Sequence, residues 1–230
     1  MVDPINIVSS TMQQDLQRIE VVSNNVANVN SVGFKAQALP NVQNNIGGVP
    51  EHENNTLSVN VSDGRLIQTG RSLDLAIQGQ GFFVVDNNGE KLLSRNGSFS
   101  VNRDGYLVTS AGSYLVQGTN GAVYIGDEAF QVKSNGQIIS NGQELDRLQV
   151  HQAFGDLRSV GNGAYQAQGS GQIVEGYTVA QGVLETSNVD VASEMMQLMS
   201  TQKHFGLIQR YFVAYDGLLK SGINQIGKVN

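Results

Sequence analysis

The chain has 230 residues, which is long enough for one or two domains with a sizeable core. Its 14 basic and 20 acidic residues give a formal net charge of −6 without a basic run, which excludes nucleic acid as a partner because a phosphate backbone requires clustered positive charge. The absence of cysteine excludes disulfides, thiolate metal sites and cysteine nucleophiles.

The first residues, Met1-Val2-Asp3-Pro4, contain neither the basic region nor the apolar region of a secretory signal peptide. No stretch of the chain approaches the roughly 18 to 20 continuous apolar residues that span a bilayer. We therefore expect no membrane insertion, and a protein that either stays in the cytoplasm or is exported without a cleaved signal.

Residues 1–35 are predicted to form an amphipathic helix and the bend that ends it. Asp3 and Pro4 are a candidate N-cap and first helical residue, since the aspartate can accept an orphan N–H and proline has none. Apolar residues recur at heptad spacing in a narrow seam that is typical of a coiled-coil surface. They are Ile5, Met12, Ile19 and Val26, with Val8, Leu16 and Val22 in the adjacent row. The helix is predicted to end between Asn28 and Gly33, because Asn and Gly tolerate the left-handed turn.

Residues 36–70 are polar and rich in Asn, Val and Gly, and they are predicted to be an extended connector. Beyond them, short apolar runs alternate with Asn-Gly and Asp-Gly pairs, the strongest hairpin signal in a sequence. The pairs begin at Asn88, Asn96, Asp104, Asn120, Asn135, Asn141 and Asn162. Together with the 27 glycines of the chain, they predict a mainly antiparallel β domain over residues 71–185.

Residues 186–230 carry a second apolar seam at strict heptad spacing. It consists of Val191, Leu198, Phe205, Phe212, Leu219 and Ile226, and Met195 widens it. Asp190 is a candidate N-cap, and Glu194 in the first turn complements the helix dipole. Gly206, Gly217 and Gly222 each weaken the helix by roughly 1 kcal/mol relative to alanine, so we expect a long helix that kinks or frays after Gly217.

These segments predict an α+β protein in which the N- and C-terminal helices form a coiled-coil domain beside a central β domain. Full burial of a seam residue contributes about 1.5 to 3 kcal/mol, whereas ordering each helix residue costs about 1 to 2 kcal/mol in backbone entropy. Because the seams are narrow, we expect the terminal helices to become stable only when neighbouring subunits cover them. The expected subunit-packing residues are Ile5, Met12, Leu16, Ile19, Val26, Val191, Met195, Leu198, Phe205, Phe212 and Leu219.

The arrangement of chemically reactive residues does not predict an enzyme. Gly79-Gln80-Gly81 lacks the third glycine of the dinucleotide fingerprint and precedes Phe82-Phe83, so a tight turn between two strands is expected. Glu51-His52-Glu53 has no second histidine at metal-binding spacing, and a solvated loop is expected. His204 is expected at an exposed or rim position beside Phe205. We expect no catalytic residue, no metal and no cofactor.

Three stretches of the chain form motifs in a fixed order. The first, residues 23–35, contains Asn24, Asn25, Asn28, Gly33 and Phe34. The second, residues 73–85, contains Gly79, Gly81, Phe82 and Phe83, and is followed by Arg95-Asn96-Gly97-Ser98-Phe99 and Asp104-Gly105-Tyr106-Leu107-Val108. The third, residues 182–190, contains Ser187, Asn188 and Val189. Together these motifs frame nearly the whole chain and closely resemble those of the flagellar rod and hook axial family.

The resemblance implies a structural subunit of the bacterial flagellar basal-body rod, which polymerises through its terminal helices into a tubular drive shaft for motility. Members of the family leave the cell through the flagellar type III export apparatus without signal cleavage, which implies a location in the basal body, in the periplasmic space. The implied partners are copies of the chain, other rod subunits, the export apparatus and surrounding ring proteins. The β domain is expected to form the outer layer of the tube. A length of 230 residues resembles the proximal rod protein with a β domain more than the slightly longer distal rod protein.

Two alternatives to the proximal rod remain at this point. One is a distal rod or hook-like axial subunit, and the other is a ligand-binding or enzymatic β domain with helical oligomerisation arms. The chain departs from the family at Gly206, where many relatives have an acidic residue after the aromatic residue of the helix. This departure concerns the straightness of the last helical turns and not the family.

Overall fold

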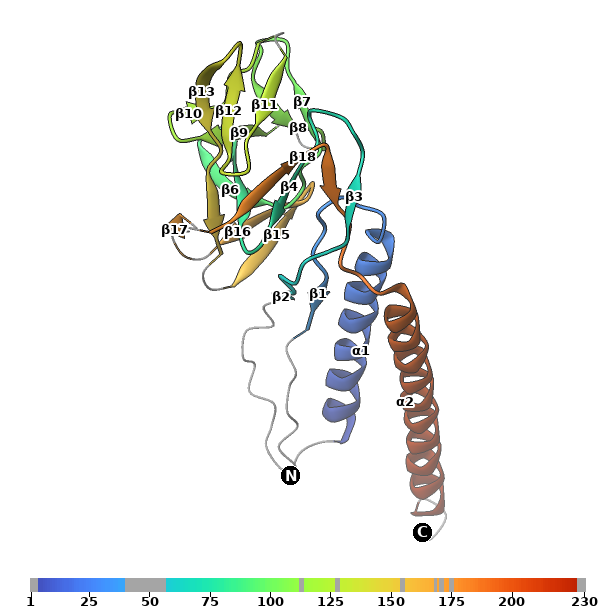
Figure 1. Cartoon of the computed structure of the whole chain (residues 1–230). Helices are drawn as coiled ribbons and strands as arrows, with labels where there is room; N and C mark the ends of the chain where they lie inside the picture. The colour runs from blue at the N-terminus through green and yellow to red at the C-terminus, as the bar shows by residue number, and fades with distance from the viewer. Residues whose placement is uncertain are drawn as a thin grey trace. The chain divides into compact units, whose positions relative to one another are not determined.

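The computed structural model describes residues 4–39, 57–111, 114–126, 129–153, 156–167, 169, 172–173 and 176–226. The chain forms two compact units (Figure 1): a helical unit of residues 1–27 and 190–230, and a β unit of residues 28–189. Helices at both ends with strands between them confirm the α+β class. Asp3, the Glu51-His52-Glu53 loop and residues 40–56 of the expected connector lie outside the described residues, as does the side chain of Ile226.

The helical unit contains α1, Pro4–Ala27, and α2, Val191–Ile226. The end of α1 lies next to the predicted turn, in which Gly33 has a φ of +65°. α2 begins directly after Asp190, whose Oδ1 accepts the N–H of Ala192 at 3.1 Å. The predicted N-cap of the second helix is therefore confirmed.

α2 continues without interruption through Gly206 and Gly217, so the prediction that it frays after Gly217 is wrong as far as Ile226. An ion pair spans the second glycine, with Asp216 Oδ2 and Lys220 Nζ 2.7 Å apart. Pairs at this i,i+4 spacing stabilise a helix by a few tenths of a kcal/mol. A single glycine weakens a helix but leaves its hydrogen bonds intact, and the strong helix formers around it keep the helix continuous.

The largest sheet of the β unit follows the strand order β15-β16-β6-β5-β9-β8-β7, with β10 paired to β9 and β14 paired to β5 and β17. These strands are β5 (Phe82–Asn87), β6 (Glu90–Ser94), β7 (Phe99–Val101), β8 (Leu107–Thr109), β9 (Leu115–Gly118), β10 (Gly121–Ala122), β14 (Val150–Gln152), β15 (Leu157–Gly161), β16 (Ala164–Ala167) and β17 (Gln172–Ile173).

Smaller sheets are formed by the remaining described strands. β1 (Gln37–Ala38) pairs with β2 (Ser58–Val59), β3 (Leu66–Gln68) with β19 (Val183–Glu185), and β4 (Leu75–Gln78) with β18 (Thr178–Gln181). A three-stranded sheet contains β11 (Phe130–Val132), β12 (Gln137–Ser140) and β13 (Gln143–Arg147). Every pairing between the described strands is antiparallel, which confirms the predicted sheet type.

Three of the predicted Asn-Gly pairs form tight hairpin turns. Asn88-Gly89, Asn141-Gly142 and Asn162-Gly163 have positive φ at both residues, as a type I′ turn requires, and they join β5 to β6, β12 to β13 and β15 to β16. Asn96-Gly97 was also expected to form a hairpin, and that expectation is wrong, because β6 and β7 are not paired. Gly97 instead lies against β4, where its carbonyl accepts the N–H of Leu75 at 2.9 Å.

Strand β5 occupies the centre of the core because both of its faces are buried. Successive side chains of a strand point to opposite faces, so Phe83 lies in the larger hydrophobic cluster and Phe82 in a smaller one. Phe83 packs edge-on against Phe99 with the ring centroids 5.2 Å apart, and Phe82 packs on Tyr165 at 6.0 Å. The two adjacent phenylalanines of the second motif thus hold two hydrophobic clusters together.

Replacing Gly97 with alanine is expected to destabilise the β unit by more than about 3 kcal/mol, because a strained buried backbone contact cannot relax without moving β4. The added Cβ would lie 1.6 Å from the carbonyl oxygen of Leu75. Thermal unfolding of the full-length chain, followed by near-ultraviolet circular dichroism, measures the effect. Gly217→Ala, which places a Cβ in open space on α2, is the control and should instead stabilise the helix by about 1 kcal/mol.

Candidate functional site

The residues predicted to pack against other subunits lie in the helical unit and fall into two groups. Met12, Ile19, Val26, Leu198 and Phe205 are half-buried. Ile5, Leu16, Val191, Met195, Phe212 and Leu219 are exposed. Contact of either group with another subunit stays a prediction, but the exposed group shows that the described residues of one chain leave part of the apolar surface of the helices uncovered.

Two polar contacts connect α1 to α2. Asp15 Oδ2 lies 2.7 Å from His204 Nδ1, and Asn25 Nδ2 donates to Glu194 Oε1 at 3.0 Å. Asp15 and Asn25 are buried, whereas the His204 side chain is 56% exposed, which confirms its predicted rim position. The two atoms of the Asp15–His204 pair lie at hydrogen-bonding distance. Asp15, which is not part of the predicted apolar seam of α1, therefore faces α2.

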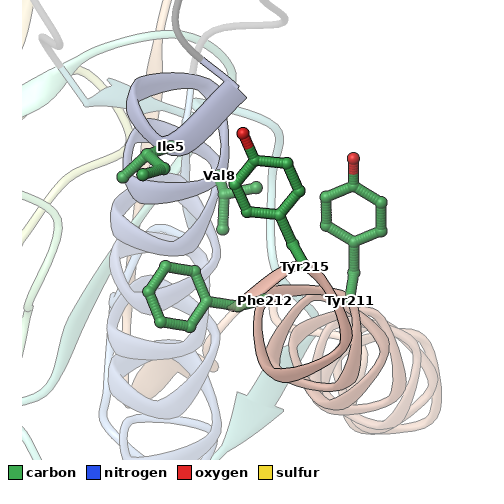
Figure 2. A pocket seen from close by; sticks show the side chains of 5 residues that line it. All are labelled: Ile5, Val8, Tyr211, Phe212 and Tyr215. Carbon is green, nitrogen blue, oxygen red and sulfur yellow. The ribbon is translucent and has the colours of Figure 1, made fainter. Parts of the chain in front are cut away.

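The two contacts show that α1 and α2 are antiparallel. Asp15 precedes Asn25 in α1, whereas its partner His204 follows Glu194, the partner of Asn25, in α2. The same alignment brings the start of α1 to the later turns of α2. There a shallow apolar groove is lined by Ile5, Val8, Tyr211, Phe212 and Tyr215 (Figure 2). The rings of Tyr211 and Tyr215 stack with their centroids 6.5 Å apart. Packing between the helices is therefore established, while coiled-coil geometry stays a prediction.

α2 also exposes apolar side chains that the heptad seam does not contain. Large apolar residues on α2 that are more than half exposed include Met196, Met199, Leu207, Val213 and Leu218. We call these five residues the outer face of α2. Exposed apolar side chains in this number on one helix are suited to protein contact.

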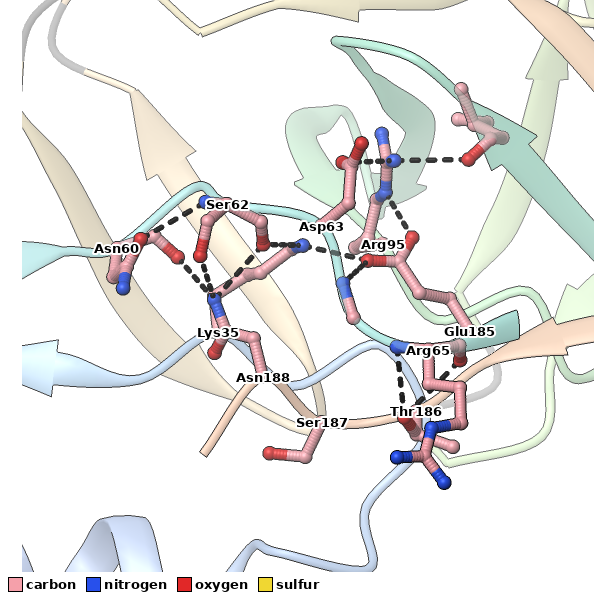
Figure 3. A network of polar contacts seen from close by, with 12 residues as sticks. Lys35, Asn60, Ser62, Asp63, Arg65, Arg95, Glu185, Thr186, Ser187 and Asn188 are labelled. Atoms are coloured by element: carbon pink, nitrogen blue, oxygen red, sulfur yellow. Dashed lines mark hydrogen bonds and ion pairs between the residues drawn. The ribbon is translucent and has the colours of Figure 1, made fainter. Parts of the chain in front are cut away.

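A buried ion cluster of Lys35, Asp63, Arg95 and Glu185 lies in the β unit (Figure 3). Glu185 accepts from Lys35 Nζ at 2.7 Å and from Arg95 Nε at 2.5 Å, and its Oε1 also accepts the backbone N–H of Gly64 at 2.7 Å. Lys35, Arg95 and Glu185 are almost fully buried, whereas the Asp63 side chain is 60% exposed. One carboxylate at the end of β19 is thus shared by two buried cations from distant parts of the chain.

Arg95 also holds the turn between β4 and β5. Its Nη2 donates to the carbonyls of Ile77 and Gly79, both at 2.9 Å, and its Nη1 donates to the carbonyl of Gly81. Gly79 and Gly81 have φ values of +100° and +135°, so the turn predicted for this motif is confirmed. The planar guanidinium is suited to this task because its donors point in fixed directions.

Asn188 of the third motif joins three segments of the β unit in the same region. Its Oδ1 accepts the N–H of Ala36 at 2.7 Å, and its Nδ2 donates to the carbonyls of Asn60 and Ser62 at 2.9 and 3.0 Å. The N–H of Gly33 donates to the carbonyl of Glu185 at 2.8 Å. The chain that follows the first helix and the chain that precedes the second are therefore hydrogen-bonded to each other.

The remaining motif residues have local roles. Phe34 is buried, Asn28 Oδ1 accepts from Ser31 Oγ at 3.0 Å, and the N–H of Val189 donates to Ser187 Oγ at 3.2 Å. Asn24 is exposed on α1.

Burial and neighbouring charges shift the pKa values of Glu185 and Lys35. Burial acts to raise the pKa of Glu185, but the hydrogen bonds from Lys35 and Gly64 and the charge of Arg95 outweigh it and lower the pKa below its ordinary value. Burial lowers the pKa of Lys35, with Glu185 acting in the opposite direction and Arg95 adding repulsion. Both cations can remain charged because the carboxylate between them is ionised.

Lys35, Arg95 and Glu185 all lie in the sequence motifs, whereas Asp63 does not. The sequence analysis did not predict that these residues form an ion cluster. Phe34 precedes Lys35 and the half-buried Leu184 precedes Glu185, whereas the polar Ser94 precedes Arg95. An apolar neighbour was therefore an available signal for Lys35 and Glu185 but not for Arg95. It indicates a buried ion pair but does not identify the partner.

The described residues provide two further observations on the class of the protein. Neither of the two helices, as far as they are described, combines the length and the hydropathy of a membrane span. His, Asp and Glu residues in the described ranges nowhere gather in a group of three that could hold a metal ion.

Comparison with known proteins relates all three motif regions to flagellar proteins. The model of the flagella basal body rod protein matches residues 5–35, that of the flagellar hook protein FlgE/F/G D1 domain matches residues 76–151, and that of the flagellar basal body rod FlgEFG protein C-terminal region matches residues 180–226. These matches cover the helices and most of the β unit.

Individual relatives match over nearly the whole chain. The basal-body rod protein FlgF of Caulobacter vibrioides is 30% identical over 245 residues, covering 97% of this chain and 98% of the relative. FlgG of Agrobacterium fabrum is 30% identical over 249 residues, covering 91% and 94%. The hook protein FlgE of Treponema pallidum is 33% identical over 164 residues, which cover 61% of this chain but 35% of the hook protein.

The chain therefore belongs to the family of flagellar basal-body rod proteins. It is a structural, non-enzymatic protein of the flagellar basal body, as the resemblance of its motifs implied.

Replacing Glu185 with alanine is expected to lower the free energy of unfolding of the β unit by about 3 to 5 kcal/mol, since it leaves two buried cations without their anion. Urea unfolding of the full-length chain, followed by tyrosine fluorescence, measures the loss. Asp63→Ala removes the exposed carboxylate from the same cluster and should cost less than about 1 kcal/mol. Equal losses in the two variants would contradict the central role of Glu185.

Acid is expected to destabilise the β unit through the same residue. Because the pKa of Glu185 is lower in the folded protein than its ordinary value of 4.5, the unfolded chain binds the proton more readily. The stability that Glu185 contributes is therefore complete above pH 4.5 and is lost as the pH falls through the lowered pKa. Unfolding midpoints measured from pH 6 downwards should fall more steeply for the wild-type chain than for Glu185→Gln, which cannot titrate.

Proposed function

We propose that the chain polymerises through its terminal helices into the tubular rod that acts as a drive shaft for flagellar rotation. The apolar surface that one chain leaves uncovered supports this proposal most directly. On α2, Met196, Val213 and Leu218 are 62%, 70% and 72% exposed. Covering each of these side chains would contribute about 1.5 to 3 kcal/mol, which offsets part of the entropy cost of ordering the helices.

The difference in helix length supports the same proposal. α2 contains 36 residues and α1 contains 24. The antiparallel alignment already brings Ile5 and Val8 next to Phe212 and Tyr215, so the turns of α2 beyond Tyr215 extend past the described start of α1. Leu218 and Leu219 lie in this extension and are exposed. A helix of another subunit would cover them.

The proposed assembly is heterologous, because a helix surface of one copy meets a different surface of the next. Such a contact does not close on itself and generates a helical tube when it repeats along an axis. The partners are then copies of the chain and other rod subunits, with the β unit in the outer layer and ring proteins around it.

The proposed route to the rod is export in an unfolded state through the flagellar type III apparatus. The lack of cysteine supports this route, since no disulfide has to be broken or formed. Ordering of the helices then coincides with assembly at the growing tip.

Within the rod, we place the chain at the proximal position. Its 230 residues support this position over the distal one, whose protein is slightly longer in this family. A hook subunit is disfavoured because the chain matches only 35% of the related hook protein.

Phe205→Asp is expected to abolish incorporation into the rod, because a carboxylate cannot be buried in the apolar contact that the half-buried Phe205 makes. Soft-agar motility of a complemented deletion strain and immunoblots of purified basal bodies measure incorporation. Gln202→Asp introduces the same charge at an exposed position of α2 and should support motility. Far-ultraviolet and near-ultraviolet circular dichroism should show a folded β unit in both variants. A motile Phe205→Asp strain would refute helix-mediated assembly.

A further inference from the structure

Apolar contact alone does not decide which faces of α1 and α2 meet. α2 has half-buried apolar residues such as Leu198 and Phe205 on one side and the exposed residues of the outer face on another. Hydrophobic burial is non-directional, so either side could in principle cover α1. Buried polar groups are different, because each requires a hydrogen-bond partner at a defined position.

The two polar pairs between the helices satisfy this requirement in one alignment. Asp15 precedes Asn25 by ten residues, and His204 follows Glu194 by ten residues. Ten residues of α-helix rise by about 15 Å, so both pairs form together when the helices are antiparallel in the observed register. A shift by one heptad would place Asp15 opposite Gln197 or Tyr211 and Asn25 opposite Ser187 or Thr201, so both observed pairs would be lost.

Burial makes these pairs selective. Asp15 is 4% exposed and Asn25 is 1% exposed, so neither side chain is well placed to replace its partner with bulk water. The second oxygen of Glu194, Oε2, is itself buried without a hydrogen-bond partner in the described structure, which shows that this face is polar at some energetic cost. A face that served only to bury apolar area would not contain these groups.

We propose that the Asp15–His204 and Asn25–Glu194 pairs are specificity determinants that select the faces through which α1 and α2 of one chain meet. Any other face of α2 would separate Asp15 from His204 and Asn25 from Glu194. The selected face is thereby reserved for the α1 of the same chain, and the outer face of α2 stays available to a second copy. The role of the outer face rests on the proposed function, whereas the selection of the inner face does not.

Cysteine cross-linking in the full-length chain tests this selection, and the absence of native cysteine makes the reporters unambiguous. The inner reporter is Val8→Cys with Tyr215→Cys, two positions that line the groove between the helices. The outer reporter is Leu16→Cys with Leu207→Cys, which are 53% and 61% exposed. Under mild oxidation, monomeric chain should form the inner disulfide and not the outer one.

The test variant is Glu194→Ala with His204→Ala, which removes both partners on α2 and leaves Asp15 and Asn25 in place. The ratio of inner to outer intramolecular disulfide should fall by about tenfold or more, because one unsatisfied buried polar group has an effect of this size. Gln197→Ala with Lys203→Ala is the matched control, since it changes two exposed residues of the same helix and leaves both pairs intact. The ratio in this control should equal that of the parent chain.

Adding Asp15→Leu and Asn25→Leu to the test variant should restore the inner disulfide, because no buried polar group then lacks a partner. An unchanged ratio in the test variant overturns the inference. So does the loss of both disulfides together with helical circular dichroism, since the pairs would then be needed for helix formation and not for selection. Failure of the parent chain to form the inner disulfide also overturns it. Each result is obtained with monomeric chain, so it is independent of whether the rod assembles.

Discussion

Glu185 lies buried between Lys35 and Arg95, two cations that are far apart in the sequence, and the contacts of the β unit at this place depend on its charge. Removal of Glu185 would leave both cations without the anion that they share, a situation that costs several kcal/mol. The carboxylate of Glu185 binds Arg95, which donates hydrogen bonds to the carbonyls of the Gly79–Gly81 turn. The backbone carbonyl of Glu185 accepts the N–H of Gly33. Residues of all three motifs therefore meet in one network of hydrogen bonds and ion pairs. Within the β unit, this network joins the chain that follows α1 to the chain that precedes α2.

The helical unit follows a different physical principle. Polar pairs connect its two helices, and the outer face of α2 exposes methionine, leucine and valine side chains. Exposed apolar side chains in this number are suited to contact with another protein. In the proposed rod, the intrachain contact would be directional, and the intermolecular contact would bury the outer face.

The two units differ in how much apolar surface each one buries. The β unit has large buried hydrophobic clusters and a compensated ion cluster, so its stability is contained within residues 28–189. The helices have little core of their own: Val21 and Val22 are the buried large apolar residues among those described in the helical unit. In the proposed rod, neighbouring subunits would order these helices, and this would couple the folding of the helices to the growth of the rod.

The sequence by itself determined the elements whose cause is local. Heptad spacing predicted both helices, Asp190 predicted the start of the second, and the Asn88, Asn141 and Asn162 turns followed from the preference of Asn-Gly for positive φ. Features that depend on distant residues were decided only by the tertiary structure. Asn96-Gly97 forms no hairpin because β4 packs against it, Asp15 faces inward because His204 is opposite, and Lys35 pairs with Glu185 150 residues further along the chain. Periodicity and turn chemistry are encoded in neighbouring residues, whereas a buried charge is stabilised by whichever partner the fold brings to it.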